Sequence, residues 1–191
     1  MTWIITRSGQ KFDLANPTAA MVHPADIAHS LSMQCRFNGH SIDFYSVAQH
    51  CCLVADLVPA EHQLHALLHD ATEAYVGDMV RPLKEAMRDR ATYLGTTCLY
   101  EATEQRVWEA ICERFNLDPV LPASVKHADL EALATEKRDL MRYHPAPWPC
   151  LEGIDPSPSE LEPWQPSAAA IYYQNRLMEL LSTTHRRRAL A

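Results

Sequence analysis

Residues 64–75 read LHALLHDATEAY, and this stretch decides which fold the chain is expected to adopt. Its apolar residues recur at intervals of three and four positions, which is the period of an amphipathic helix. On a helical wheel at about 100° per residue they gather on one side, while His69, Asp70 and Glu73 occupy an arc on the opposite side. The pattern predicts a helix over about residues 60–75. One face would pack on the core, and the other would present three side chains able to do chemistry.

The helical period continues on both sides of this segment. Further helices are predicted over about residues 24–35, 42–57, 93–115, 122–141 and 168–182. Trp3–Ile5 and Lys11–Leu14 flank a turn at Arg7-Ser8-Gly9 and predict a short β-hairpin. Seven prolines between His144 and Pro166 indicate an ordered loop or flap.

These elements predict an all-α fold with a minor N-terminal hairpin, organised as one domain over residues 1–191. Its expected parts are a hairpin in residues 1–20, a catalytic helical core in 21–141, the proline-rich loop in 142–167, and a C-terminal helix and basic tail in 168–191. The basic tail contains His185–Arg188, whose side chains we expect to be solvated.

Composition limits the classes of partner. The net charge of −7 argues against binding of nucleic acid polymers, which needs a basic surface to release counterions. The sequence shows no basic and apolar leader and no apolar run near the roughly 18 residues of a membrane span, so we expect a cytoplasmic protein without a membrane partner. Six cysteines include no C-x-x-C pair, as in reducing compartments. Cys51 and Cys112 lie on apolar helical stripes, where we expect them to act as small hydrophobes.

Two polar residues lie where apolar ones are expected. Asp129 falls in the middle of an apolar helical stripe that contains Val125, Ala132, Leu133 and Leu140. His50 lies on a helix that is apolar nearly all round, beside Leu53, Val54 and Leu57. A carboxylate removed from water is costly unless it is paired or bound to a metal. Taken singly, each residue also fits a hydrogen-bonded core histidine or an aspartate that caps a helix or pairs with arginine.

The conjunction of these fragments favours a metal centre. His50, His69, Asp70 and Asp129 come from three separate predicted helices and supply two imidazoles and two carboxylates. This donor set suits a borderline transition metal such as Mn²⁺, Co²⁺, Ni²⁺ or Zn²⁺. A cation held there would offset the buried carboxylates and lower the pKa of a bound water, and Glu73 is left as a spare acid.

The ordered motifs resemble those of the HD-domain metal-dependent phosphohydrolases. The resemblance is greatest to small nucleotidases of bacteria and prophages that cleave deoxynucleoside monophosphates, and phage enzymes that remove triphosphate from dATP are also similar. The matching segments are Cys35–His40 (CRFNGH), Tyr45–His50 (YSVAQH), His69–Tyr75 (HDATEAY), Gly77-Asp78, Pro82–Lys84 (PLK), Val125–Asp129 (VKHAD) and Ala134–Asp139 (ATEKRD). They span roughly residues 20 to 140, and Trp148-Pro149 with Leu151–Gly153 is similar to the prophage branch.

The resemblance implies an HD-domain helical fold and a role for each matching residue. His50, His69, Asp70 and Asp129 would be the metal ligands, with Mg²⁺ as an optional second ion. Glu73 would be the acid/base that works beside the ion together with Asp70.

Substrate contacts follow from the same resemblance. Arg36 would bind phosphate oxygens through its planar donor fork, and Asp78 would face the sugar hydroxyl. Lys84 would either contact phosphate or lie on the surface. Phe37, which we include among the substrate-binding residues, departs from the bacterial deoxynucleotidases, which have tryptophan after the arginine.

The expected function is hydrolysis of deoxynucleoside 5′-monophosphates to nucleoside and phosphate by a self-associating protein. An alternative is a dNTP triphosphohydrolase that releases tripolyphosphate, for which Lys84, Arg81, Lys126 and Arg138 are the candidate basic groups. A second class is a non-catalytic nucleotide sensor. A third is a helical interaction module with a structural zinc, in which His65 and His69 would be ligands.

Overall fold

The computed structural model describes the backbone of residues 1–189 and the side chains of residues 1–183, and it is mostly helical, with 58% helix and 4% strand. The strands are β1 (Trp3–Ile5) and β2 (Lys11–Asp13), and the short 3₁₀ segments are η1 (Ala19–Met21), η2 (Arg36–Gly39) and η3 (Pro149–Leu151). The α-helices are α1 (Pro24–Met33), α2 (Val47–Asp56), α3 (Gln63–Leu68), α4 (Glu73–Val76), α5 (Arg81–Tyr93), α6 (Leu99–Phe115), α7 (Ala123–Leu140) and α8 (Pro166–Ala189). The predicted helical fold with an N-terminal hairpin is confirmed.

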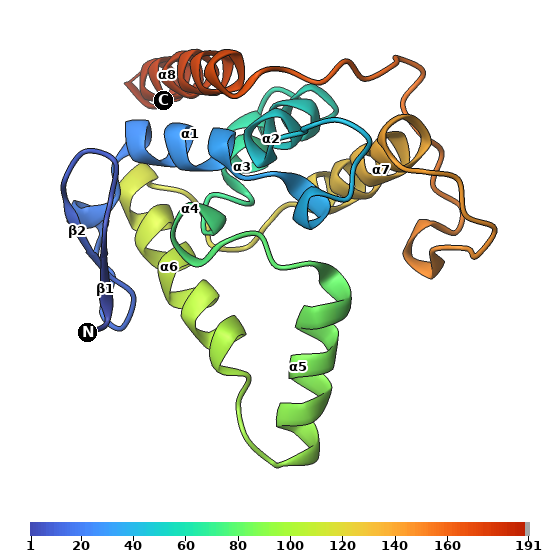
Figure 1. The fold of residues 1–191 in the computed structure, drawn as a ribbon. Helices are drawn as coiled ribbons and strands as arrows, with labels where there is room; N and C mark the ends of the chain where they lie inside the picture. Colours follow the sequence, from blue (N-terminus) through green and yellow to red (C-terminus); the bar gives the residue numbers. More distant parts are fainter. Residues whose placement is uncertain (190–191) are drawn as a thin grey trace.

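The core lies between α8 and the helices beneath it. In Figure 1, α8 runs across the top of the molecule over α1 and α2, with which it packs, while α5 and the first half of α6 project downwards. Tyr173 and Leu177 of α8 are fully buried, and the Tyr173 hydroxyl donates a 2.9 Å hydrogen bond to the Leu67 carbonyl at the end of α3. No helix within residues 1–189 is both long and apolar enough to cross a membrane.

The hairpin pairs as predicted and is anchored by one aromatic residue. β1 and β2 are antiparallel, with Ile4 opposite Phe12. Gly9, at φ +80°, supplies the positive φ that the turn requires. Phe12 is fully buried and stacks on Tyr75, with ring centroids 3.7 Å apart. The hairpin therefore packs against the segment that also contains Glu73.

The predicted helix over residues 60–75 is wrong in its central part. The chain forms α3 and α4, and residues 69–72 between them make a tighter turn. Its hydrogen bonds include Ala71 N–H to the Leu68 carbonyl and Glu73 N–H to the Asp70 carbonyl, which span three residues instead of four. Because a 3₁₀ turn advances about 120° per residue, the helical wheel does not describe where these side chains point.

Other helix bounds also differ from the predictions. The helix predicted from residue 42 begins at Val47, where the Ser46 hydroxyl caps it by accepting the Gln49 N–H at 3.1 Å. α8 begins at Pro166 and its backbone stays helical to Ala189, through the segment predicted as a basic tail. The prediction that the His185–Arg188 side chains are solvated falls outside residues 1–183, whose side chains the structure describes.

α5 was not predicted, and the helix predicted from residue 93 begins instead at Leu99 after a break that contains Gly95. None of the residues of α5 is buried. Helix prediction from apolar periodicity depends on a buried stripe, and a projecting helix of this kind has none.

Replacing Phe12 by alanine is expected to lower the free energy of unfolding by about 3–5 kcal/mol, because the change empties a fully buried site and removes the stack on Tyr75. The matched control is Ile5→Ala on the neighbouring strand, where the side chain is 68% exposed and the expected change is within about 0.5 kcal/mol. Urea denaturation of the two variants measures this difference. Equal effects of the two substitutions would show that the hairpin is not anchored through Phe12.

Candidate metal centre

Four of the predicted site residues come together where α2, the turn after α3, and α7 meet. His50 Nε2 lies 3.3 Å from His69 Nε2, 3.5 Å from Asp70 Oδ2 and 3.2 Å from Asp129 Oδ1. His69 Nε2 lies 3.3 Å from Asp70 Oδ2 and 3.8 Å from Asp129 Oδ1. The sequence prediction that these side chains converge from separate elements is therefore met by the geometry.

These spacings fit a shared metal ion. Ligand atoms placed about 2.1 Å from one tetrahedral centre lie about 3.4 Å from each other. The five distances between donor atoms scatter around this value. Two imidazole nitrogens and two carboxylates are also the donors that a divalent cation takes. The ligand atoms of His50, His69 and Asp129 all lie within 4.8 Å of one another, and Asp70 lies outside this group. Three of the residues can therefore hold such an ion as they stand, and Asp70 would reach it by a side-chain adjustment.

Hydrogen bonds on the far side of each imidazole leave Nε2 available as a ligand. His69 Nδ1 is 2.7 Å from the Ala66 carbonyl oxygen, which can only accept, so Nδ1 carries the proton. His50 Nδ1 is 2.6 Å from Glu136 Oε1. Metal-binding histidines in proteins are oriented by partners of this kind. In the neutral form, both Nε2 lone pairs then point into the centre.

Glu136 is the residue whose role the sequence analysis missed. It is fully buried on α7, and its second oxygen, Oε2, lies 3.2 Å from the Arg36 guanidinium. Although burial opposes ionisation, the charges of Arg36 and His50 hold the pKa of Glu136 below its usual value. The available signal was its spacing, because Glu136 lies seven residues after Asp129 and therefore on the same side of the helix.

Arg36 links this buried carboxylate to the metal centre. Its guanidinium also lies 3.6 Å from Asp70 Oδ2, and only 11% of its side chain is exposed. η2 carries it, and there Phe37 and Asn38 both adopt positive φ values, of 56° and 52°. A left-handed backbone at two consecutive non-glycine residues is strained, and such strain often marks functional sites.

Glu73 is buried beside the four ligands and keeps one oxygen unused. Its Oε2 has no hydrogen-bond partner among the described residues, and the residue is 5% exposed. Burial, followed by the negative charge of Asp70, raises the pKa of Glu73 well above its usual value. A cation nearby would lower the pKa of Glu73 again, because it favours the charged carboxylate.

Gln34, which sequence reasoning also missed, holds the backbone on both sides of this region. Its side-chain amide donates to the Glu73 carbonyl at 2.9 Å, and its Oε1 accepts the Asp78 N–H at 3.0 Å. Asp78 is half-buried, and burial raises its pKa. The residue predicted to face a sugar hydroxyl thus lies on the same short segment as Glu73.

Three expectations need correction. Asp129 is not deeply buried, since 31% of its side chain is exposed, so it lies at the opening of the centre. His69 and Glu73 do not lie on an outward helix face; both side chains are within the interior. Lys84 is paired with Glu104 of α6 at 2.9 Å, and therefore is not a free surface lysine.

The pH dependence of metal stabilisation follows from the imidazoles. Burial opposes protonation of His69, but the charge of Asp70 outweighs it, and the pKa lies well above 6.5. A histidine whose pKa is higher in the folded than in the unfolded protein stabilises the fold fully at pH values below the unfolded-state pKa. This contribution to stability is lost as the pH rises through the folded-state pKa. Because an ion must displace this proton, saturating Mn²⁺ is expected to raise Tm more at about pH 8 than at about pH 6.

Thermal melts of the metal-free and Mn²⁺-saturated protein at both pH values measure this effect. His127→Asn is the matched control, because His127 is exposed on α7 and its loss should leave the difference intact, whereas His69→Asn should remove it. A Tm gain that is equal at both pH values would contradict the assignment.

Comparison with known proteins identifies relatives of the chain. No family model matches it. YfdR of Escherichia coli (strain K12), described as uncharacterized, is 45% identical over 156 residues, which cover 81% of each chain. An uncharacterized protein of Rhodobacter capsulatus is 37% identical over 135 residues, which cover 66% of this chain and 64% of that protein. The level and the extent of the first match show that this chain belongs to the family of YfdR.

Proposed function

We propose that the chain is an HD-domain metal-dependent phosphohydrolase that converts deoxynucleoside 5′-monophosphates to nucleoside and phosphate. The observation that carries the proposal is the approach of Asp70 and Asp129 to the paired imidazoles of His50 and His69, together with the buried, unpaired Oε2 of Glu73. A sensor needs no buried acid with an unused oxygen at this place. Mn²⁺, Co²⁺, Ni²⁺ and Zn²⁺ are the ions that the donor set suits.

The side chains divide the work of phosphate-ester hydrolysis. The bound ion would supply a Lewis acid that makes water more acidic and offsets charge on the phosphate. Glu73 would accept a proton from the attacking water and return one to the 5′-oxygen as it leaves. The guanidinium of Arg36, already aimed at Asp70, would donate hydrogen bonds to phosphate oxygens as negative charge shifts to the leaving group.

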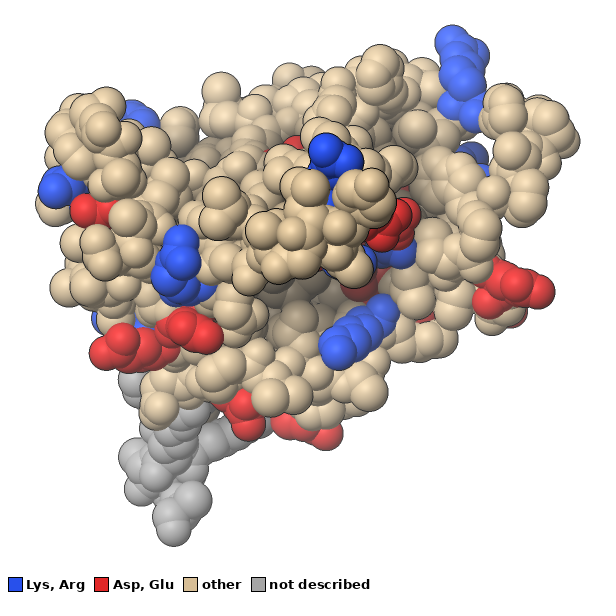
Figure 2. All heavy atoms as spheres, turned by 90° about the horizontal axis from the view of Figure 1, so that it is seen from below, with Lys and Arg blue, Asp and Glu red and all other residues tan. Residues whose placement is uncertain are grey.

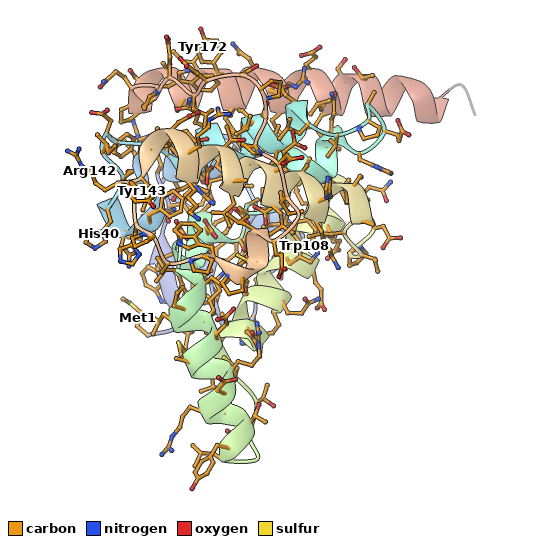
Figure 3. All side chains as sticks on the ribbon, turned by 90° about the vertical axis from the view of Figure 1, so that its right-hand side faces the viewer. Met1, His40, Trp108, Arg142, Tyr143 and Tyr172 are labelled. Atoms are coloured by element: carbon orange, nitrogen blue, oxygen red, sulfur yellow. The ribbon has the colours of Figure 1, made fainter. Side chains whose placement is uncertain are left out.

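An aromatic wall next to Arg36 would receive the nucleoside. Arg36 lies over the ring of Phe37, and Phe37 is 6.4 Å from Trp148 at the start of η3. Lys137 of α7 lies over Trp148. In Figure 3, His40 after η2 is on the same side of the molecule as Arg142 and Tyr143 after α7. A hydrogen bond from the Ile42 N–H to the Leu140 carbonyl joins these two segments. Aromatic faces and a nearby cation suit a planar base.

The later part of the proline-rich loop that carries Trp148 is held by side chains of two helices. The Gln49 side chain, next to His50, donates to the Glu162 carbonyl and accepts the Trp164 N–H. Arg138 donates to the carbonyls of Ser157 and Ser159. These bonds fix the later part of the loop against α2 and α7, the two helices that supply His50 and Asp129.

The basic groups favour a monophosphate over a triphosphate. Of the four candidates for binding further phosphates, Arg138 is bound to Asp139 and to the loop, and Lys84 is paired with Glu104. Arg81 and Lys126 are exposed. On the face shown in Figure 2, the lysines and arginines drawn in blue stand apart from one another and form no continuous basic patch. This charge pattern supports a small substrate rather than a nucleic acid polymer.

Three further expectations accompany the proposal. Self-association, a cytoplasmic location and Mg²⁺ as a second ion stay predictions. The structural-zinc alternative gains no support from the described side chains, because His65 belongs to neither group of potential metal ligands and its Nε2 lies 3.1 Å from the Asp118 carbonyl oxygen.

Replacing Glu73 by glutamine is expected to slow phosphate release from deoxynucleoside monophosphates by about 100-fold to 10,000-fold, because the proton transfer is lost while the ligands stay in place. Mn²⁺ binding, measured by calorimetry, should be retained. Glu85→Gln, an exposed change on α5, is the control and should leave the rate unchanged.

The assay is incubation with Mn²⁺ or Co²⁺ and a panel of nucleotides, followed by separation of the products. Free phosphate from monophosphates supports the proposal, whereas tripolyphosphate from dATP supports the triphosphohydrolase alternative. A Glu73→Gln protein that hydrolyses nucleotides at the wild-type rate would remove Glu73 from the mechanism.

A further inference from the structure

Cys51 belongs to a second group of metal-binding atoms that overlaps the first. The ligand atoms of His50, His69 and Asp129 all lie within 4.8 Å of one another, and so do those of Cys51, His69 and Asp70. His69 is therefore common to two triads. Cys51 directly follows His50 on α2 and is 0% exposed. The sequence analysis treated this thiol as a small hydrophobic residue, and its neighbours in space make that account incomplete.

The position of the thiol relative to the imidazole distinguishes Cys51 from its neighbour Cys52. The Cys51 sulfur lies within 4.8 Å of the ligand atoms of His69 and Asp70, so it is at the edge of the metal centre. Cys52 is also buried, but it belongs to neither group of potential metal ligands. Two adjacent cysteines in one helix thus face different surroundings.

Sulfur changes which ions the centre prefers. Thiolates bind soft and borderline ions such as Zn²⁺ and Cd²⁺ strongly, whereas Mn²⁺ and Mg²⁺ prefer carboxylate and imidazole donors. The thiol proton is released to solvent when the ion binds. A thiophilic ion would therefore be drawn towards Cys51, away from His50 and Asp129, while it still uses His69 and Asp70.

We propose that Cys51 is an additional ligand for thiophilic divalent ions, which bind through Cys51, His69 and Asp70, while Mn²⁺ binds through the four ligands of the proposed phosphohydrolase centre. The inference rests on the proposed function, because both binding modes share His69 and Asp70. Its consequence is competition: Zn²⁺ or Cd²⁺ displaces Mn²⁺ and holds the shared ligands in the other arrangement.

The test is a Cd²⁺ titration of the metal-free full chain, followed by the ultraviolet charge-transfer absorption of cadmium bound to thiolate. The half-exposed cysteines Cys35 and Cys150 are replaced by serine in every sample to remove weak surface binding. We expect the absorption band in this background and in Cys52→Ala. Cys51→Ala should lose the band and bind Cd²⁺ at least about tenfold more weakly. Cys51→Ser, closer in size and polarity, should behave like Cys51→Ala and guards against a folding defect.

Mn²⁺ binding to the same proteins separates this inference from the proposed function. All variants should bind Mn²⁺ with equal affinity. Displacement of Mn²⁺ should need a higher Cd²⁺ concentration in the two Cys51 variants than in the background protein. A cadmium–thiolate band that persists in both Cys51 variants, or that is missing from the background protein, overturns the inference. If Mn²⁺ binding is normal in the same samples, the proposed metal centre is unaffected by that result. Absence of Mn²⁺ binding in every protein would instead reject the proposed centre.

Discussion

Glu136 is fully buried on α7, and its two oxygens bind the Arg36 guanidinium and the His50 imidazole. A charge in the interior is tolerated only when it is paired and hydrogen-bonded. This pairing fixes the orientation of His50, so that Nε2 points towards His69 and Asp129. The same pairing holds Arg36 next to Asp70. The rest of the site depends on this one buried carboxylate, since it positions both a proposed metal ligand, His50, and the proposed phosphate-binding cation, Arg36.

The carboxylates of the centre leave a charge that a cation would balance. Asp70 and Asp129 both approach the two imidazoles, and Glu73 is buried close by. Although burial opposes ionisation of Asp129, hydrogen bonds to His50 and His69 lower its pKa well below the usual value. The pKa values of His50 and His69 are both raised, so a proton held on either imidazole offsets part of this negative charge. A divalent ion would replace those protons at the same position, which is the physical basis of the proposed hydrolytic centre.

Sequence patterns predicted the helices that carry a buried stripe and the residues that break such a stripe. His50 and Asp129 were found because a polar group on an apolar helix needs a partner. α5 was missed because its residues are not buried, and the turn at residues 69–72 was missed because apolar spacing does not distinguish it from a helix. Glu136 and Gln34 are polar residues whose roles come from contacts with distant segments, which local patterns do not contain. Cys51 is buried in the core as predicted, but its approach to His69 and Asp70 could not be predicted for the same reason.

The most direct test of the shared ion is a Mn²⁺ titration of the wild-type protein and of Asp129→Asn, followed by the electron paramagnetic resonance signal of free Mn²⁺. Asp129 is the proposed ligand that comes from α7, and asparagine keeps its size while it removes the charge. The account predicts saturable binding to the wild type and affinity at least about tenfold lower in the variant. Equal affinity of the two proteins for Mn²⁺ would contradict it.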